Sequence, residues 1–329
     1  SICEGAVKID DLQDFSKLKK FQSLGLCDTS NLCGALEFAE KISKVGTQPI
    51  IGTQINFKYG DTIGLLPLFS LNEEGYKRII NLSSLSYLEN DELSDPHMDF
   101  EQLLEDNEGV ALFSGTIFGL FGKLFDKGKF SEIHDIYKKI KSKYNDRFYL
   151  EIQRHNDQNE LDFEKFNLKE SLKLEIPIIA TNEVFYINKD MHEAHDALIC
   201  IGNKAYVNEK NRIKFSNQHY FKSNLEMQEL FADLPEALEN NYNFPFRCNF
   251  RPLFSNPILP NISSEKGGNA DDVLKKDSIH GLKIKFNKIF GIKSNELEKN
   301  KTYIDYRDRL EHELSIITEM KYSSYFLIV

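Results

Sequence analysis

Residues that could bind a metal ion follow several apolar runs of the sequence, at points where strands are expected to end. The residues at these points are Asp28, Thr29, Gln54, Asn56, Ser114, Thr116, Gln153, His155, Asn182, Glu183 and Phe185. Carboxylates and imidazoles are common ligands of divalent metals, and a metal-bound water can supply hydroxide near neutral pH. Only some of these residues can bind a metal, so the residues alone leave open whether this is a working site.

The elements that would position these residues alternate between helical and strand periodicities. Helical spacing of apolar residues is found at 9–18, 32–42, 73–87, 100–104, 131–143 and 160–173. Strand-like apolar runs lie at 23–27, 48–57, 64–70, 109–114, 147–153 and 176–182. This alternation predicts an α/β fold with a mainly parallel sheet, in which functional residues gather at the carboxyl ends of the strands.

The composition is ordinary for a globular protein and limits the partners of the chain. The 329 residues include 41 Lys and Arg against 51 Asp and Glu, a formal net charge of −10, so the chain as a whole repels a phosphate backbone. Its apolar runs are shorter than the roughly 20 residues of a membrane helix, and its first residues lack a signal-peptide pattern. We therefore expect a cytoplasmic protein with no membrane partner, whose five scattered cysteines are reduced.

Three other features have ordinary explanations. His192 and His195 stand three residues apart on an expected helix, and we interpret them as capping or surface residues because a third ligand is not evident nearby. The glycines of SGTIFGLFGK match neither a P-loop nor a dinucleotide fingerprint and predict a turn leading into a helix. The lysine runs KLKK and KKIKSK are typical of solvated helix faces.

The sequence changes character beyond about Asn203, where short helical segments replace the alternating pattern. Residues 251–270 are rich in proline and contain a Gly-Gly pair, a composition that marks a connection between domains. Residues 271–286 and 305–320 are amphipathic and predict two further helices.

Several motifs, in their order and spacing, resemble the N-terminal PHP (polymerase and histidinol phosphatase) domain of bacterial replicative DNA polymerases, the family of DNA polymerase III alpha subunits. They are CDTSNLCGALEF, QPIIGTQINF, RFYLEIQRHN, IPIIATNEVFYI, EAHDALICIG and EMQELFADLPEALENN. The closing RLEHELSIITEMKYSSYFLIV is similar to the family's entry into its palm domain. The resemblance covers essentially the whole chain.

This resemblance implies a distorted (β/α) barrel of the PHP type over residues 1–255, a linker over 256–270 and the N-terminal part of a palm region over 271–329. It also implies that the family's first strand, with a His-x-His pair, is expected before Ser1. The family's polymerase aspartates, which hold two magnesium ions, are expected beyond Val329, so that these residues make up an N-terminal part of the polymerase.

The resemblance also assigns the possible metal ligands. Glu4 matches an acidic ligand, His155 matches a histidine ligand, and Glu183 replaces an aspartate. The remaining positions are substituted: Thr29 and Phe185 stand where metal-binding members have histidine, Gln54 where they have glutamate, and Thr116 where cysteine or histidine can serve. We therefore expect a vestigial site without a metal; a single ion held weakly by His155 and Glu183 is the alternative.

Three functions remain open at this point. The resemblance implies a scaffold within a DNA-directed DNA polymerase that uses Mg²⁺, with no catalytic residue and no cofactor in this part. It further implies docking of the proofreading exonuclease subunit, with other replicase subunits and primer-template DNA bound through the remaining parts. The alternatives are a metal-dependent PHP phosphoesterase or 3'-5' exonuclease, which needs an intact ligand set, and an interaction module without an enzymatic parent.

Overall fold

The computed structural model describes residues 4–90, 94–105, 107–255, 269–292 and 296–329. The chain falls into two units, Ser1–Phe254 and Ser255–Val329, and each is described by itself. The predicted linker at 256–270 lies almost entirely outside the described residues. The assignment of 271–329 to a palm region stays a prediction.

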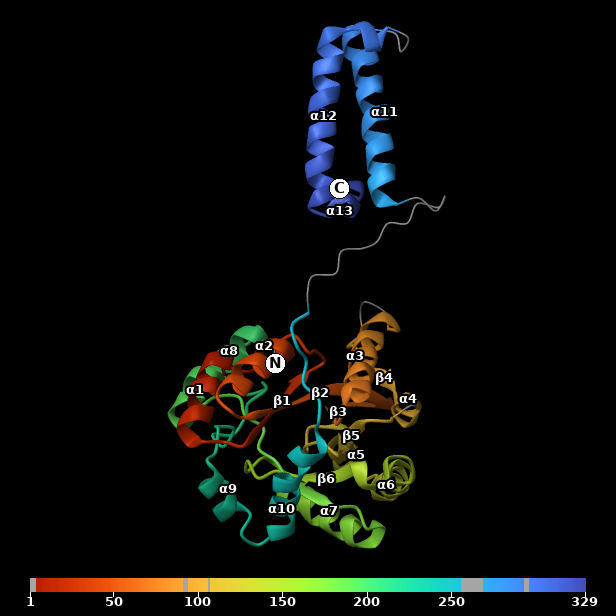
Figure 1. The fold of residues 1–329 in the computed structure, drawn as a ribbon. Helices are drawn as coiled ribbons and strands as arrows, with labels where there is room; N and C mark the ends of the chain where they lie inside the picture. The colour runs from red at the N-terminus through yellow and green to blue at the C-terminus, as the bar shows by residue number, and fades with distance from the viewer. Residues whose placement is uncertain (1–3, 91–93, 106, 256–268, 293–295) are drawn as a thin grey trace. The chain divides into compact units, whose positions relative to one another are not determined.

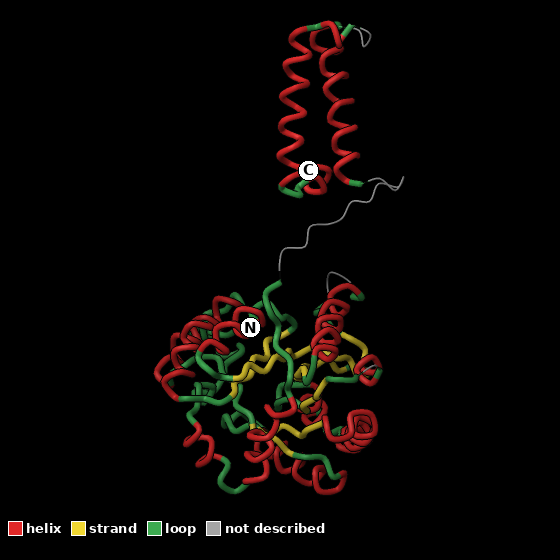
Figure 2. Tube along the Cα trace, in the orientation of Figure 1, coloured by secondary structure: helices red, strands yellow, loops and turns green. Residues whose placement is uncertain are grey.

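The first unit is built on a curled sheet of seven strands, in the order β1-β2-β3-β5-β6-β7 with β4 beside β2 (Figures 1 and 2). The strands are β1 (Ser23–Thr29), β2 (Gln48–Tyr59), β3 (Thr62–Ser70), β4 (Met98–Asp99), β5 (Val110–Phe113), β6 (Phe148–Ile152) and β7 (Ile178–Ala180). Four of the strand pairs, β1–β2, β2–β4, β5–β6 and β6–β7, are parallel. The mainly parallel α/β sheet expected from the sequence is thus confirmed, as a half-barrel whose outer strands are β1 and β7.

The departure from parallel order is the long hairpin of β2 and β3. The two strands pair antiparallel from Gly52↔Phe69 to Tyr59↔Thr62, and β3 also pairs antiparallel with β5. Only Gly60 and Asp61 connect them, and Gly60 takes a φ of 58°, a conformation that glycine adopts without steric cost. The sequence contains no helical segment between these two strands, so this reversal is a direct result of the two-residue turn.

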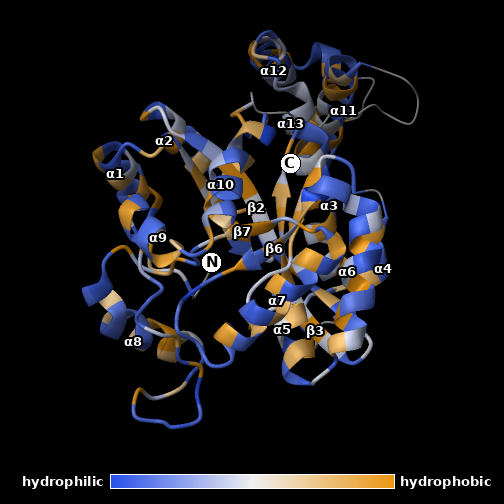
Figure 3. Cartoon of the chain, turned by 90° about the horizontal axis from the view of Figure 1, so that it is seen from below, coloured by the Kyte–Doolittle hydropathy of each residue, from blue (hydrophilic) through white to orange (hydrophobic). Residues whose placement is uncertain are grey.

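Helices pack around the sheet and supply most of the remaining core. They are α1 (Ile9–Lys19), α2 (Ala35–Lys44), α3 (Glu73–Leu88), α4 (Phe100–Leu104), α5 (Leu120–Asp126), α6 (Phe130–Tyr144), α7 (Glu160–Leu174), α8 (His192–Gly202), α9 (Asn224–Leu230) and α10 (Pro235–Asn243), with short 3-10 turns at Asn145–Arg147, Lys189–Met191 and Phe244–Arg247. Figure 3 shows hydrophobic residues concentrated on the strands and on one side of the helices, with hydrophilic residues on the other side.

The amphipathic helices bury the faces that their periodicity predicts. Along α6, Ile133, Ile136, Tyr137 and Ile140 are buried, and Tyr137 packs edge-on against the ring of Phe148 on β6. Burying an aliphatic or aromatic side chain of this size contributes about 1.5–3 kcal/mol. This packing holds β6, and therefore the residues that follow it, in a fixed position.

The second unit is a helical hairpin. It contains α11 (Ala270–Phe290), the turn Leu297–Lys299, α12 (Lys301–Glu319) and α13 (Ser323–Ile328). Its small core consists of Phe286, Leu297 and Tyr303. Among the described residues of the whole chain, no helix is long and apolar enough to cross a membrane.

Candidate metal centre at the carboxyl ends of the strands

The residues singled out in the sequence gather at the carboxyl ends of the parallel strands. Thr29 ends β1 and lies in register with Gln54 of β2. His155 follows β6, and Glu183 and Phe185 follow β7. The carboxyl ends of parallel strands lie at the same edge of the half-barrel, meaning the rim formed by these strand ends. The topology therefore brings the residues singled out in the sequence together there.

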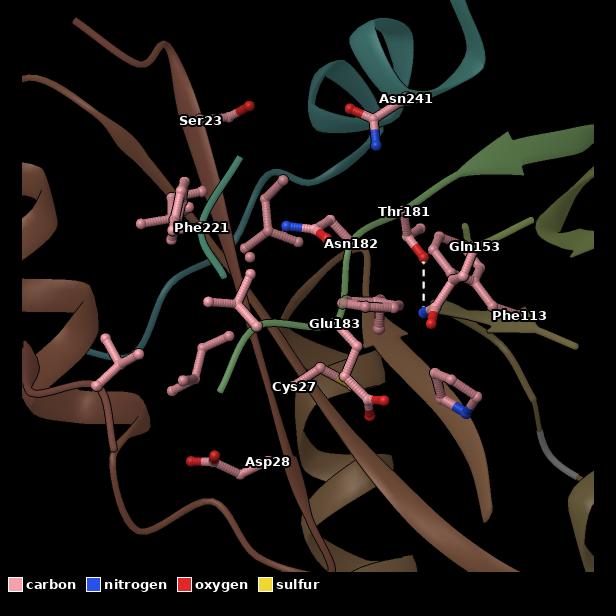
Figure 4. A pocket seen from close by; sticks show the side chains of 18 of the residues that line it. Ser23, Cys27, Asp28, Phe113, Gln153, Thr181, Asn182, Glu183, Phe221 and Asn241 are labelled. Carbon is pink, nitrogen blue, oxygen red and sulfur yellow. Dashed lines mark hydrogen bonds between the residues drawn. The ribbon is translucent and has the colours of Figure 1, made fainter. Parts of the chain in front are cut away.

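A cavity of about 520 Å³ runs inward from this edge between β1 and β7. Figure 4 shows Cys27, Asp28, Thr181, Asn182 and Glu183 among the residues that line it. The cavity combines apolar walls with a few polar groups, a composition common in ligand sites.

Glu4 accepts a hydrogen bond from Thr29, which stands where the resemblance implies a histidine ligand. The hydroxyl Oγ1 of Thr29 donates to Oε2 of Glu4 over 3.2 Å. The backbone carbonyl of Glu4 also accepts from Nε2 of His195 at 2.7 Å. The carboxylate and the carbonyl of Glu4 are therefore both held by protein donors.

Glu183 accepts a hydrogen bond from Gln54, which stands where the resemblance implies a glutamate. The amide Nε2 of Gln54 donates to Oε1 of Glu183 over 3.2 Å. A neutral amide offers an N–H to the carboxylate, whereas a second carboxylate would repel it unless a cation lay between them. At both substituted positions, a hydrogen-bond donor now faces the surviving acid.

Phe185 fills the space beside these acids with an aromatic ring. The ring is only 8% exposed and stacks on His195, with centroids 5.2 Å apart and an interplanar angle of 10°. On its other side it lies 5.0 Å from the ring of His219. The interpretation of His195 as a capping or surface residue is wrong, because it is 2% exposed; burial also lowers its pKa, which keeps the ring neutral at neutral pH.

His155 is buried and joined to the loop after β7. Its Nε2 lies 3.1 Å from Oδ1 of Asn182, and the amide nitrogen of Asn182 donates to the carbonyl of Tyr220. Because that amide nitrogen is already engaged, Oδ1 is the atom that faces His155, so His155 Nε2 carries the hydrogen. Lys222 donates to the same Oδ1 at 3.0 Å.

Thr116 lies at the same edge, in the turn between β5 and α5. Its Oγ1 accepts the backbone N–H of Phe118 at 3.1 Å, which shapes the start of the turn. The glycine-containing segment therefore forms a turn that leads into helix α5, as predicted.

Three titratable groups that line the cavity have strongly shifted pKa values. Burial raises the pKa of Glu151 to about 7, although Thr181 and Gln153 donate hydrogen bonds that oppose this shift. Burial lowers the pKa of Lys222 to about 8. Burial and the neighbouring carboxylates raise the pKa of Cys27, so this thiol is not a nucleophile near neutral pH.

Sequence reasoning missed Asp157 and His219, which lie against His155. Asp157 could have been found, because it stands two residues after His155 in the same strand-end loop. His219 lies in an irregular segment that contacts the rest of the unit through an isolated bridge between Tyr186 and Tyr220. A single histidine in such a segment carries no periodic signal, so the sequence could not place it.

The comparisons with known proteins agree with this arrangement of elements. Residues 1–155 match the family model described as PHP domain. The chain is 36% identical to the DNA polymerase III subunit alpha of Rickettsia conorii, in an alignment that covers 100% of this chain and 28% of that protein. The chain contains a PHP domain.

Further relatives extend the match from the PHP domain to the whole chain. The DNA polymerase III subunits alpha of Caulobacter vibrioides and Borreliella burgdorferi are 35% and 34% identical, each over 100% of this chain and 29% of their own length. The chain matches the N-terminal part of these proteins and spans well under a third of their length. The resemblance expected from the motifs is confirmed.

The metal ions expected in a PHP domain do not fit the residues present. Phe185 offers no lone pair and occupies the space between two imidazole rings. Gln54 and Thr29 are neutral side chains at positions where the resemblance implies a carboxylate and an imidazole, and each donates a hydrogen bond to a carboxylate. A cluster of several ions needs anionic and imidazole donors that converge, and these described residues do not supply such a set.

Proposed function

We propose that this chain is the PHP-domain part of a replicative DNA polymerase and serves there as a scaffold. The parent protein would carry out template-directed DNA synthesis with Mg²⁺ in the cytoplasm, through segments outside these residues. The observation that carries the proposal is the internal pairing of Thr29 with Glu4 and of Gln54 with Glu183, beside the buried ring of Phe185. These contacts stabilise the loops at the strand ends without a metal cluster.

We further propose that the domain docks the proofreading exonuclease subunit of the replicase. The support is the match to DNA polymerase III alpha subunits over the whole chain, together with a net charge of −10 that makes protein a better partner than DNA. Primer-template DNA and other replicase subunits would bind through the rest of the polymerase.

If the domain is a scaffold, the chain should not hydrolyse phosphate esters, and the reason should be the side chains of Thr29, Gln54 and Phe185. We expect the purified chain to leave single-stranded DNA and simple phosphate esters intact in the presence of Mn²⁺ or Mg²⁺. The combined variant Thr29→His, Gln54→Glu and Phe185→His should bind more divalent metal than the natural chain, because it restores the lost donors and removes the ring. Metal content after gel filtration and release of labelled nucleotides measure the two outcomes.

The matched control is the single variant Phe185→Leu, which removes the ring without adding a ligand. It should gain no metal and no hydrolysis. Manganese-stimulated hydrolysis by the natural chain that disappears in His155→Ala would contradict the scaffold role and would favour the phosphoesterase or 3'-5' exonuclease alternative.

A further inference from the structure

We propose that His155, Asp157 and His219 form a site for one divalent metal ion, which shares only His155 with the ligand positions that the family resemblance assigns. One ligand atom from each of the three side chains lies within 4.8 Å of the other two. His155 and His219 are each 1% exposed, and the side chain of Asp157 is 8% exposed. Asp157 and His219 match no ligand of the family's centre, and the inference goes beyond the scaffold role because it requires no catalysis.

The hydrogen bonds of His219 leave one ring nitrogen facing a carboxylate. Nδ1 lies 3.2 Å from the backbone carbonyl of Glu183, an acceptor, so Nδ1 carries the hydrogen. In the neutral ring, Nε2 then has a lone pair, and it faces Oδ2 of Asp157. A lone pair that faces a carboxylate requires a proton or a cation between them.

The separation of these two atoms favours a metal ion. Nε2 of His219 and Oδ2 of Asp157 are 3.3 Å apart. A charge-assisted N–H···O bond is usually shorter, about 2.7–2.9 Å. Two ligands of a tetrahedral zinc ion, each about 2.0–2.1 Å from the metal, lie about 3.3–3.4 Å apart. The separation of 3.3 Å is compatible with two neighbouring ligands of one ion.

The remaining contacts provide the outer support that metal-binding histidines usually have. A ligand histidine commonly donates its other N–H to a carbonyl or carboxylate, which fixes its orientation. His219 has the carbonyl of Glu183 in this role, and His155 has Oδ1 of Asn182. Glu160 accepts the backbone N–H groups of His155 and Asn156, which holds the loop that carries two of the ligands.

The rings show what must change when the ion binds. His155 and His219 stack with centroids 4.0 Å apart and an interplanar angle of 8°. Lone pairs of parallel rings do not converge, so at least one of the two rings must turn from this arrangement when the ion binds. The ring centroid of Phe185 lies 5.0 Å from that of His219, on the border of the site. Two imidazoles and one carboxylate are a ligand set that suits zinc.

The test is metal binding by the whole chain, with Co²⁺ as a spectroscopic probe and Zn²⁺ as its competitor. All variants carry Cys33→Ser, because the exposed thiol of Cys33 would also bind zinc. We expect one Co²⁺ per chain, with the intense visible absorption of four-coordinate cobalt and without a thiolate band. Zn²⁺ should displace it.

Two variants and one control assign the site. Asp157→Asn keeps the shape of the side chain and should weaken binding at least about 10-fold, and His219→Gln should abolish it. His312→Gln removes an exposed histidine of the second unit and should leave binding unchanged. Circular dichroism of the metal-free variants checks their folding. If His219→Gln proves to be unfolded, the metal affinity of Asp157→Asn is the deciding measurement. The proposal is overturned if no ion binds, or if Asp157→Asn binds as tightly as the parent chain.

This outcome is independent of the scaffold role. A bound ion without hydrolysis supports both proposals. The weaker binding expected for Asp157→Asn is measured by cobalt absorption and needs no assay of enzymatic activity. Failure of the scaffold role would instead appear as hydrolysis by the natural chain.

Discussion

Glu151 is a buried carboxylic acid at the end of β6, and its Oε2 atom has no hydrogen-bond partner among the described residues. Its pKa is raised from 4.5 to about 7, chiefly by burial. The folded chain therefore keeps this proton up to about pH 7, while the unfolded chain releases it above about pH 4.5. Folding stability contributed by Glu151 is present at low pH and is lost as the pH rises from about 4.5 to about 7.

The variant Glu151→Gln should therefore stabilise the fold at pH 8 more than at pH 5. A shift of this size corresponds to a difference of roughly 2–3 kcal/mol between the two pH values. Urea unfolding of both proteins at pH 5 and pH 8 measures it. Glu229→Gln, an exposed change on α9, controls for the loss of one negative charge. A stability difference that stays constant with pH would exclude this account of Glu151.

At the residue scale, the sequence placed Thr29, Gln54 and Phe185 at strand ends, and the resemblance implied that they stand at ligand positions, but neither predicted the contacts that they make. Thr29, Gln54 and Phe185 could be identified because each stands at a strand end within a motif. Their partners could not, since Thr29 and Glu4 are 25 residues apart and Gln54 and Glu183 are 129 apart. Such contacts depend on side-chain directions that follow only from the complete fold.

Helix α3 depends on a close approach between two glycines. Its N-cap Asn72 accepts the N–H of Gly75, and two glutamates follow in the first turn, where they complement the helix dipole. A Cβ atom added at Gly75 would lie 1.8 Å from the carbonyl oxygen of Gly109, which is backbone and cannot move aside. Gly75 therefore sets the distance between α3 and the residues that lead into β5.

We predict that Gly75→Ala destabilises the first unit by about 1–3 kcal/mol, as overpacking does, despite the better helix propensity of alanine. Thermal unfolding followed by circular dichroism measures the change. The matched control is Gly281→Ala in α11, where a Cβ would meet no heavy atom within 4 Å. That change should stabilise its helix by up to about 1 kcal/mol. A Gly75→Ala variant as stable as the natural chain would show that the helix can shift freely.

At the element scale, the periodicity of apolar residues predicted the positions of helices and strands to within about three residues in the part of the chain where they alternate. The helix predicted at 73–87 is found at Glu73–Leu88, and the one predicted at 160–173 is found at Glu160–Leu174. The strand predicted at 64–70 is found at Thr62–Ser70, but its antiparallel direction was not predicted. Apolar alternation reports burial and not strand direction, and the turn at Gly60 decides the direction.

The charge of the whole molecule predicts its behaviour toward nucleic acid. With 51 acidic against 41 basic residues, the chain should bind neither single-stranded nor duplex DNA tightly at about 0.15 M salt. Fluorescence anisotropy of labelled oligonucleotides at several salt concentrations measures this. Sub-micromolar binding that weakens steeply with salt would contradict the prediction and would indicate a local cluster of lysines that outweighs the net charge.

The hydrogen bond between Gln54 and Glu183 limits which side chain position 54 can hold. Glutamate at position 54 alone would set two carboxylates about as close together as Gln54 Nε2 and Glu183 Oε1 are now, 3.2 Å apart. Like charges at that separation repel strongly unless one of them takes up a proton. A glutamate at position 54 would therefore fit beside Glu183 only with a shared proton or with a cation between the two carboxylates.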